Sequence, residues 1–209
     1  VTLSNSGTIN VDSTGSVGIN ADNAVGAKDK FVVDNSGIVN VKKNSSAGIN
    51  AITSTVNTVK DSQINLTAEK TAGIIAKTGS EVINNGKIST SVVSVTAAAD
   101  GLVGISADAS TVTNGSTGEI TLGTAFSAGI YGTGTNTSTI KNAGEITANE
   151  NKSVGIYVEA NSTAENTGKI TMEKEGSAAM YGDESKITNK KDRTAVGKII
   201  IEGKDSAAM

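Results

Sequence analysis

Apolar residues recur at every second position in short runs along the whole chain, and Gly, Asn and Ser separate the runs. Such alternation predicts short β-strands that bury one face. Two motifs repeat. An N-x-G motif opens one alternating run, as in NAGEITA at 142–148 and NTGKITM at 166–172. An S-x-G motif opens the next, as in SVGIYV at 153–158 and, with Ala in place of Gly, SAAMYG at 177–182.

Both motifs occur eight times at a nearly constant separation. The central aliphatic residue after N-x-G stands at Ile9, Val39, Ile64, Ile88, Ile120, Ile146, Ile170 and Ile199. The small residue of the S-x-G motif stands at Gly18, Gly48, Gly73, Gly104, Gly129, Gly155, Ala179 and Ala208. The two are 9 residues apart in seven copies and 16 apart in the fourth. Successive copies of one motif are 24 to 32 residues apart.

A third apolar run precedes most N-x-G motifs, at 31–35, 81–85, 111–114, 139–142 and 186–189. Three short strands in each repeat of about 25 residues predict one turn of a solenoid. We therefore expect an all-β fold, a parallel β-helix of about eight coils with a roughly triangular section. It would be a single unit over residues 1–209. Both ends of the sequence lie inside strand-like runs, which suggests a segment of a longer chain.

Equivalent residues should stack in columns along this solenoid, about 4.8 Å apart. We expect three inward columns in the S-x-G strand, which begin at Val17, Ile19 and Ala21. The Asn of the N-x-G motif recurs at 5, 35, 85, 114, 142, 166 and 189, and its amide can bond the amide of the next coil.

The composition agrees with stacked aliphatic columns, because only 2% of the residues are aromatic and Pro is absent. His and Cys are also absent, which removes imidazole bases, thiolate nucleophiles and disulfides. The net charge of −3 supplies no field for nucleic acid. We expect no catalytic residues, no metal and no cofactor, and no run is long enough for a membrane-spanning helix.

Three insertions interrupt the rhythm, at 22–30, 91–101 and 190–196. Recognition by solenoids often uses such loops. The second insertion lengthens the otherwise constant corner, and the third holds the only Arg, Arg193. Candidate binding residues in these two insertions are Val92, Val93, Val95, Asp100 and Arg193. Neutral variation of a tolerated loop is the other interpretation.

Tyr131, Tyr157 and Tyr181 occupy one outward position in three successive S-x-G strands. They should form an aromatic ladder. It is either a platform for sugar rings or a partner surface, or a stack whose rings cover one another and the sheet. In the N-x-G strands, Glu119, Glu145 and Lys169 should form a solvated charge ladder. The Thr column at 121, 147 and 171 next to it is ordinary strand material.

The pairing of GEITL at 118–122 with SAGIY at 127–131, repeated at 142–157 and 166–181, resembles the passenger domain of type Va autotransporters. More narrowly, it resembles the very large surface adhesins of fusobacteria. The resemblance covers essentially the whole chain. It implies a right-handed helix at the cell surface, outer-membrane anchoring through a C-terminal barrel that lies outside this sequence, and adhesion to bacterial or host surfaces.

We therefore expect an adhesin stalk segment whose partners are surface proteins or glycans of host or bacterial cells. Its cut ends would expose strand edges, so that the segment could associate end to end. One alternative is a polysaccharide-active or phage tailspike-type β-helix, and clustering of Asp100, Asp108 and Glu119 in one groove would favour it. Another is an ice-binding or surface-layer solenoid, which would need paired ranks of Thr on a flat face.

Overall fold

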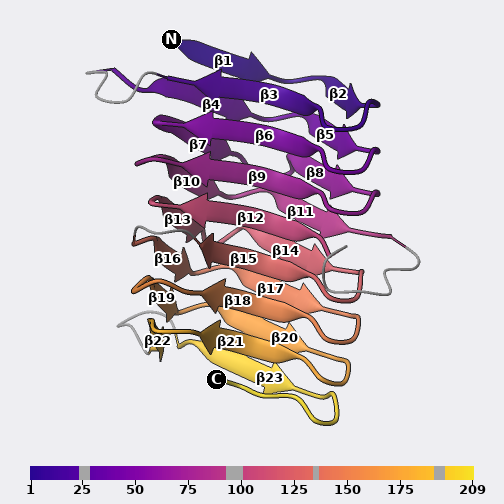
Figure 1. Cartoon of the computed structure of the whole chain (residues 1–209), viewed down its shortest axis with the longest axis vertical. Coiled ribbons are helices and arrows are strands. Elements are labelled where there is room, and N and C mark those ends of the chain that lie inside the picture. The colour runs from indigo at the N-terminus through magenta and orange to yellow at the C-terminus, as the bar shows by residue number, and fades with distance from the viewer. Residues whose placement is uncertain (24–28, 93–100, 134–136, 191–195) are drawn as a thin grey trace.

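The computed structural model describes residues 1–23, 29–92, 101–133, 137–190 and 196–209. In these ranges every regular element is a β-strand, and the strands form three parallel sheets stacked as a solenoid (Figure 1). The chain passes through the three sheets in turn and then begins the next coil. The predicted all-β solenoid with three strands per coil is confirmed.

The first sheet holds eight strands from the runs that precede N-x-G. They are β1 (Thr2–Asn5), β4 (Phe31–Asn35), β7 (Ser54–Thr58), β10 (Glu81–Asn84), β13 (Thr111–Asn114), β16 (Thr139–Asn142), β19 (Thr163–Asn166) and β22 (Lys186–Asn189).

The second sheet holds the eight strands of the N-x-G motif. They are β2 (Thr8–Val11), β5 (Ile38–Val41), β8 (Gln63–Leu66), β11 (Lys87–Thr90), β14 (Glu119–Leu122), β17 (Glu145–Ala148), β20 (Lys169–Met172) and β23 (Lys198–Ile201).

The third sheet holds seven strands of the S-x-G motif. They are β3 (Val17–Asp22), β6 (Ala47–Ile52), β9 (Ala72–Lys77), β12 (Val103–Asp108), β15 (Ala128–Thr133), β18 (Val154–Val158) and β21 (Ala178–Gly182). In the eighth coil this strand is reduced to a single bridge between Ala178 and Ala207, so about seven turns are complete.

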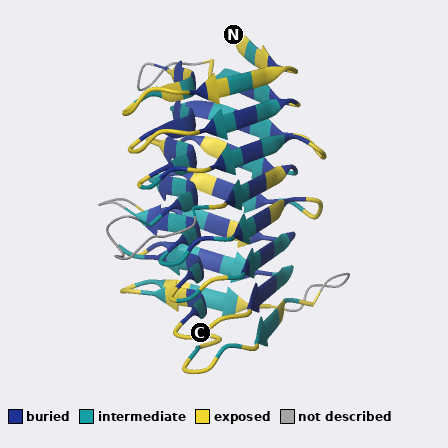
Figure 2. Ribbon diagram, turned by 90° about the vertical axis from the view of Figure 1, so that its right-hand side faces the viewer, coloured by how far each residue is buried: buried dark blue, intermediate teal, exposed yellow. Residues whose placement is uncertain are grey.

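One core runs the length of the rod, and it is built from aliphatic columns (Figure 2). Ile49, Ile74, Ile105, Ile130 and Ile156 are fully buried in the third sheet and lie in register with one another. Each side chain therefore packs on its own equivalent above and below. This arrangement buries apolar area without large aromatic rings, as the composition predicted.

The expected inward column that begins at Val17 is wrong except at Ala47, which is its one buried member. Strand pairing passes over the Gly of each S-x-G motif, joining Val17 to Ala47 and Ile19 to Ile49. A Cβ on Gly18 would meet the side chains of Ile9 and Val11, so this position faces the core. Because the Gly and the following Ile both face inward, the residue before them turns outward, and Val17 is 41% exposed. The true inward column is the Gly column.

The Gly column is required by the close approach of neighbouring coils. A Cβ on Gly104 would lie 2.5 Å from the carbonyl oxygen of Gly129 and 3.1 Å from Cγ2 of Ile120. The equivalent atom on Gly48 would lie 2.7 Å from the carbonyl oxygen of Gly73. A Cβ at Gly48 or Gly104 must displace backbone, which explains why the column holds only Gly and, at 179 and 208, Ala.

A buried Asn ladder follows the corner between the first and second sheets, as predicted. Asn142 accepts a hydrogen bond from Nδ2 of Asn114 and donates one to Oδ1 of Asn166, both at 2.7 Å. In the fourth coil the sequence placed the ladder at Asn85, but Asn84 is the buried member and donates to Asn114 at 2.8 Å. The sequence there reads Asn84-Asn85-Gly86, so the N-x-G spacing itself selects Asn84.

Candidate functional site: an aromatic face and its groove

In the part of the chain that the structure describes, a residue with positive φ makes the corner between the second and third sheets in seven coils. These residues are Gly15, Ser45, Lys70, Phe126, Lys152, Gly176 and Asp205, with φ between 51° and 70°. A left-handed residue at a fixed place explains the constant 9-residue spacing of the motifs. Gly adopts this conformation freely, whereas a bulky side chain does so at a cost. Phe126 is the bulkiest residue in the column.

The three tyrosines lie in register on strands β15, β18 and β21, as the sequence predicted. The rings of Tyr131 and Tyr157 are stacked, with centroids 5.0 Å apart and planes 5° apart. Tyr181 is tilted by 57° relative to Tyr157, and 52% of its surface is exposed. Tyr131 and Tyr157 therefore each cover one face of the other's ring. Tyr181 has the most accessible ring of the ladder.

Glu159 ties the hydroxyl groups of the ladder together. Its Oε1 accepts hydrogen bonds from the Tyr131 hydroxyl at 2.9 Å and the Thr133 hydroxyl at 2.7 Å. Its Oε2 accepts one from the Tyr157 hydroxyl at 3.2 Å. Burial, followed by the hydrogen bond to Glu159 and the negative charge of that carboxylate, raises the pKa of Tyr157 to about 12. Both tyrosines are neutral at physiological pH and act as the hydrogen-bond donors in these contacts.

The pKa of Tyr131 is raised as well, chiefly because its hydroxyl loses solvent. The Thr133 hydrogen bond opposes this rise, and Glu159 supports it. The carboxylate thus fixes two neighbouring rings in one orientation, which makes the stacked pair a rigid element of the surface.

A groove of about 350 Å³ lies beside the ladder. Its aromatic walls are Phe126, Tyr131 and Tyr157, and the ammonium of Lys152 lies 5.2 Å from the centre of the Phe126 ring. The groove is also lined by Val103, Ala128 and Val154, which are the outward-turned residues that precede the Gly column. The residues that the sequence misassigned to the core therefore line this groove.

The groove brings two sequence-based candidates together. Gly101, the last residue of the 91–101 insertion, lines it alongside the tyrosine ladder. At the other end of that insertion, the Val92 amide donates to Oγ1 of Thr124 at 2.8 Å, and Val92 packs partly on the core. Val93, Val95, Asp100 and Arg193 lie outside the described residues, so their predicted roles stay predictions.

Phe126 and Lys152 are the residues that sequence reasoning missed. Neither belongs to a motif, and both stand at the corner rather than in a strand. The available signal was their place three residues before the motif Gly, in a chain with only five aromatic residues. Alignment of the eight coils would have put Phe126 at a position that holds Gly, Ser, Lys or Asp elsewhere.

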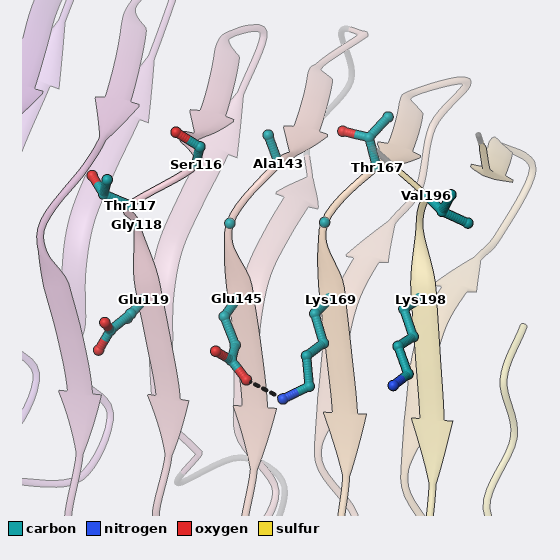
Figure 3. A pocket seen from close by; sticks show the side chains of 12 residues that line it. Ser116, Thr117, Gly118, Glu119, Ala143, Glu145, Thr167, Lys169, Val196 and Lys198 are labelled. Atoms are coloured by element: carbon teal, nitrogen blue, oxygen red, sulfur yellow. Dashed lines mark hydrogen bonds and ion pairs between the residues drawn. The ribbon is translucent and has the colours of Figure 1, made fainter. Parts of the chain in front are cut away.

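The predicted charge ladder lies on the second sheet and borders a second groove of about 450 Å³ (Figure 3). Lys169 pairs with Glu145, as expected, and Lys87 pairs with Glu119 at 3.2 Å. Figure 3 shows Glu119, Glu145 and Lys169 on adjacent strands, and Gly144 and Gly168 also line the groove. Surface pairs of this kind contribute about 0.2–1 kcal/mol each, so the ladder is a solvated face.

Within the described ranges, no three His, Cys, Asp or Glu residues gather closely enough to hold a metal ion. Asp108 ends β12 in the third sheet, whereas Glu119 begins β14 in the second, so these two acids do not share a groove. Asp100, the third acid of that hypothesis, is outside the described residues. The described ranges also contain no helix long and apolar enough to cross a membrane.

Residues 1–207 match the family model described as the BigA third pectate lyase-like domain. The chain belongs to this family. In that description, pectate lyase-like names a fold and assigns no activity to the chain. The match and the solenoid together fit a bacterial surface β-helix protein. No curated protein and no solved structure matches the chain significantly.

Proposed function

We propose that this chain is an adhesive segment of a rod that bacteria display on their surface. It would be carried as an autotransporter-type passenger, outside the outer membrane, and would contact proteins or glycans of host cells or other bacteria. In this proposal the segment spaces and binds, and it does not catalyse. The family match and the unbroken solenoid support the display role, because a stack of coils sets a length rather than a closed catalytic pocket.

One observation carries the adhesive part of the proposal: four of the five aromatic residues gather on one side of the rod. Phe126, Tyr131 and Tyr157 line one groove, and Tyr181 continues the ladder with an exposed ring. Tyrosine supplies contact area with little loss of side-chain entropy and is enriched where proteins bind partners.

The test is adhesion of beads coated with the 209-residue chain to bacterial and epithelial cells. The variant is Tyr131→Ser, Tyr157→Asn and Tyr181→Asn together, because Ser106, Asn50 and Asn20 hold the same register positions in other coils. We expect the variant to fold and to lose most adhesion. The matched control is Thr121→Asn with Thr147→Asn on the second sheet, where Asn40 and Asn65 are the native precedents. Equal adhesion by all three proteins would contradict the proposal.

A further inference from the structure

Phe126 is the only aromatic residue among the seven residues of the corner column. Its φ of 58° is a left-handed conformation, which Gly15 and Gly176 adopt without strain and which Ser45, Lys70, Lys152 and Asp205 also adopt. An aromatic residue held in a strained conformation beside a groove points to a role for its ring. The ring packs partly on the core, and its other neighbour is the Lys152 ammonium.

The groove has an aromatic ring face that the tyrosine ladder leaves open. On one side, the Tyr131 ring stacks on Tyr157 of the sixth coil. On the other side, its register partner in the fourth coil is Ser106, which has no ring. The face of Tyr131 on that side is therefore not covered by another ring of the ladder. Together with Phe126 and the aliphatic residues Val103 and Ala128, it gives the groove flat apolar walls.

The charge of the groove is positive. Among the described residues, Lys152 is the only charged residue that lines the groove, and it forms no ion pair with any of them. Its ammonium is exposed and lies over the Phe126 ring, where the quadrupole of the ring attracts it. Glu159 engages the tyrosine hydroxyls and does not line the groove. An anionic group at the Lys152 end would complete this arrangement.

Backbone pairing argues against an extended peptide as the occupant. Strands β12, β15 and β18, which border the groove, each pair with a neighbouring strand on both sides. No free sheet edge is present there, so a peptide cannot add a strand. Recognition must come from side chains. A sugar ring suits them, because it has an apolar C–H face and a polar rim.

We propose that the groove between Phe126 and Tyr131 binds one carboxylate-bearing sugar residue of a surface glycan, with the carboxylate at Lys152. The volume of about 350 Å³ is near the lower limit of small-molecule sites, about 300 Å³, and suits one pyranose ring. This inference rests on the proposed adhesive function and names its ligand class.

The test is calorimetric titration of the 209-residue chain with two matched pairs of probes. Sialyllactose is compared with lactose, and a glucuronosyl disaccharide with cellobiose. The variants are Phe126→Gly, Tyr131→Ser and Lys152→Ser, each copying the residue that another coil carries at the same position. Ser45→Gly and Lys70→Ser change the same corner two or more coils away and serve as controls. Circular dichroism checks that each variant keeps its fold.

We expect at least one acidic probe to bind and its neutral counterpart to bind about tenfold more weakly or not at all. Each groove variant should lose about tenfold in affinity, and the two controls should bind as the unmodified chain does. Three results would overturn the inference: equal affinity for acidic and neutral sugars, an affinity that Lys152→Ser does not change, or no binding of any probe. If the coated beads still adhere through the tyrosine face in that case, the proposed function stands and only its ligand class is wrong.

Discussion

The first three coils and the fifth to seventh coils share one interior but differ on their outer faces. In the early coils, outward positions hold asparagines that bond one another, as Asn40 does with Asn10 and Asn65. In the later coils the equivalent positions hold threonine on the second sheet and tyrosine on the third. The comparison teaches that the core columns fix the fold, while the outer columns are free to change chemistry.

The two outer faces also differ in what they offer to a partner. An asparagine ladder uses its own amides for bonds along the rod, as Asn50 does when it donates to Asn20 at 2.7 Å. The tyrosine ladder leaves Tyr181 exposed and has a groove at its other end. The later coils are therefore the half of the described rod to which we assign the proposed adhesion.

The largest expected effect tests whether the interior is the same in both halves. Gly104→Val places side-chain atoms against the Gly129 backbone, and Gly48→Val does so against Gly73. Overpacking against backbone costs about 3 kcal/mol, so both variants should unfold at much lower denaturant concentration. Chemical denaturation followed by circular dichroism measures this. The control is Gly7→Ala, where nothing lies within 4 Å of the added Cβ. A mild effect in one half alone would show that the two interiors differ.

The next effect separates a buried ladder from an exposed one. Asn142→Ala leaves Asn114 and Asn166 without their buried partner, at a cost of about 2 kcal/mol. Asn40→Ala removes the same kind of bond at the surface, where water replaces it, and should cost less than about 0.5 kcal/mol. The free energies of unfolding of the two variants give the comparison. Equal losses would mean that burial does not set the strength of these ladders.

The smallest effect concerns pH and belongs to the tyrosine half. Because the pKa of Tyr157 is raised to about 12, the folded state holds its proton more tightly than the unfolded chain, where the pKa is about 10. Stability should be unaffected by this group below pH 10 and should fall between about pH 10 and 12. Tyr157→Phe should lose less stability over that interval. Melting temperatures from pH 9 to 12 test this, and parallel curves for both proteins would contradict it.

Much of the fold was predictable because each coil repeats the same three strands and the same buried columns. The alternation gave the strands, the motif spacing gave the coils, and the aliphatic columns headed by Ile19 and Ala21 were assigned correctly. The column headed by Val17 was assigned incorrectly to the core, because strict alternation of inward and outward residues assumes a regular strand. The Gly of the motif breaks that regularity by facing inward next to Ile19, and only the close approach of the coils reveals it.

The candidate site was predictable in part for a related reason. Register alone places Tyr131, Tyr157 and Tyr181 in one column, so the ladder follows from the repeat. The groove does not follow from the repeat, because its lining residues come from a corner, from strands and from the end of an insertion. The left-handed backbone conformation of Phe126 could not be predicted from the pattern of apolar and polar residues.

The direction of the strands has a mechanical consequence. Each strand crosses the rod, so the hydrogen bonds that join consecutive coils run along its length, in all three sheets at once. A pulling force between the two ends would load the bonds of all three sheets together at every junction between coils. Tension applied through an attached cell would therefore be shared by three sheets, and yielding would begin at the junction with the fewest bonds.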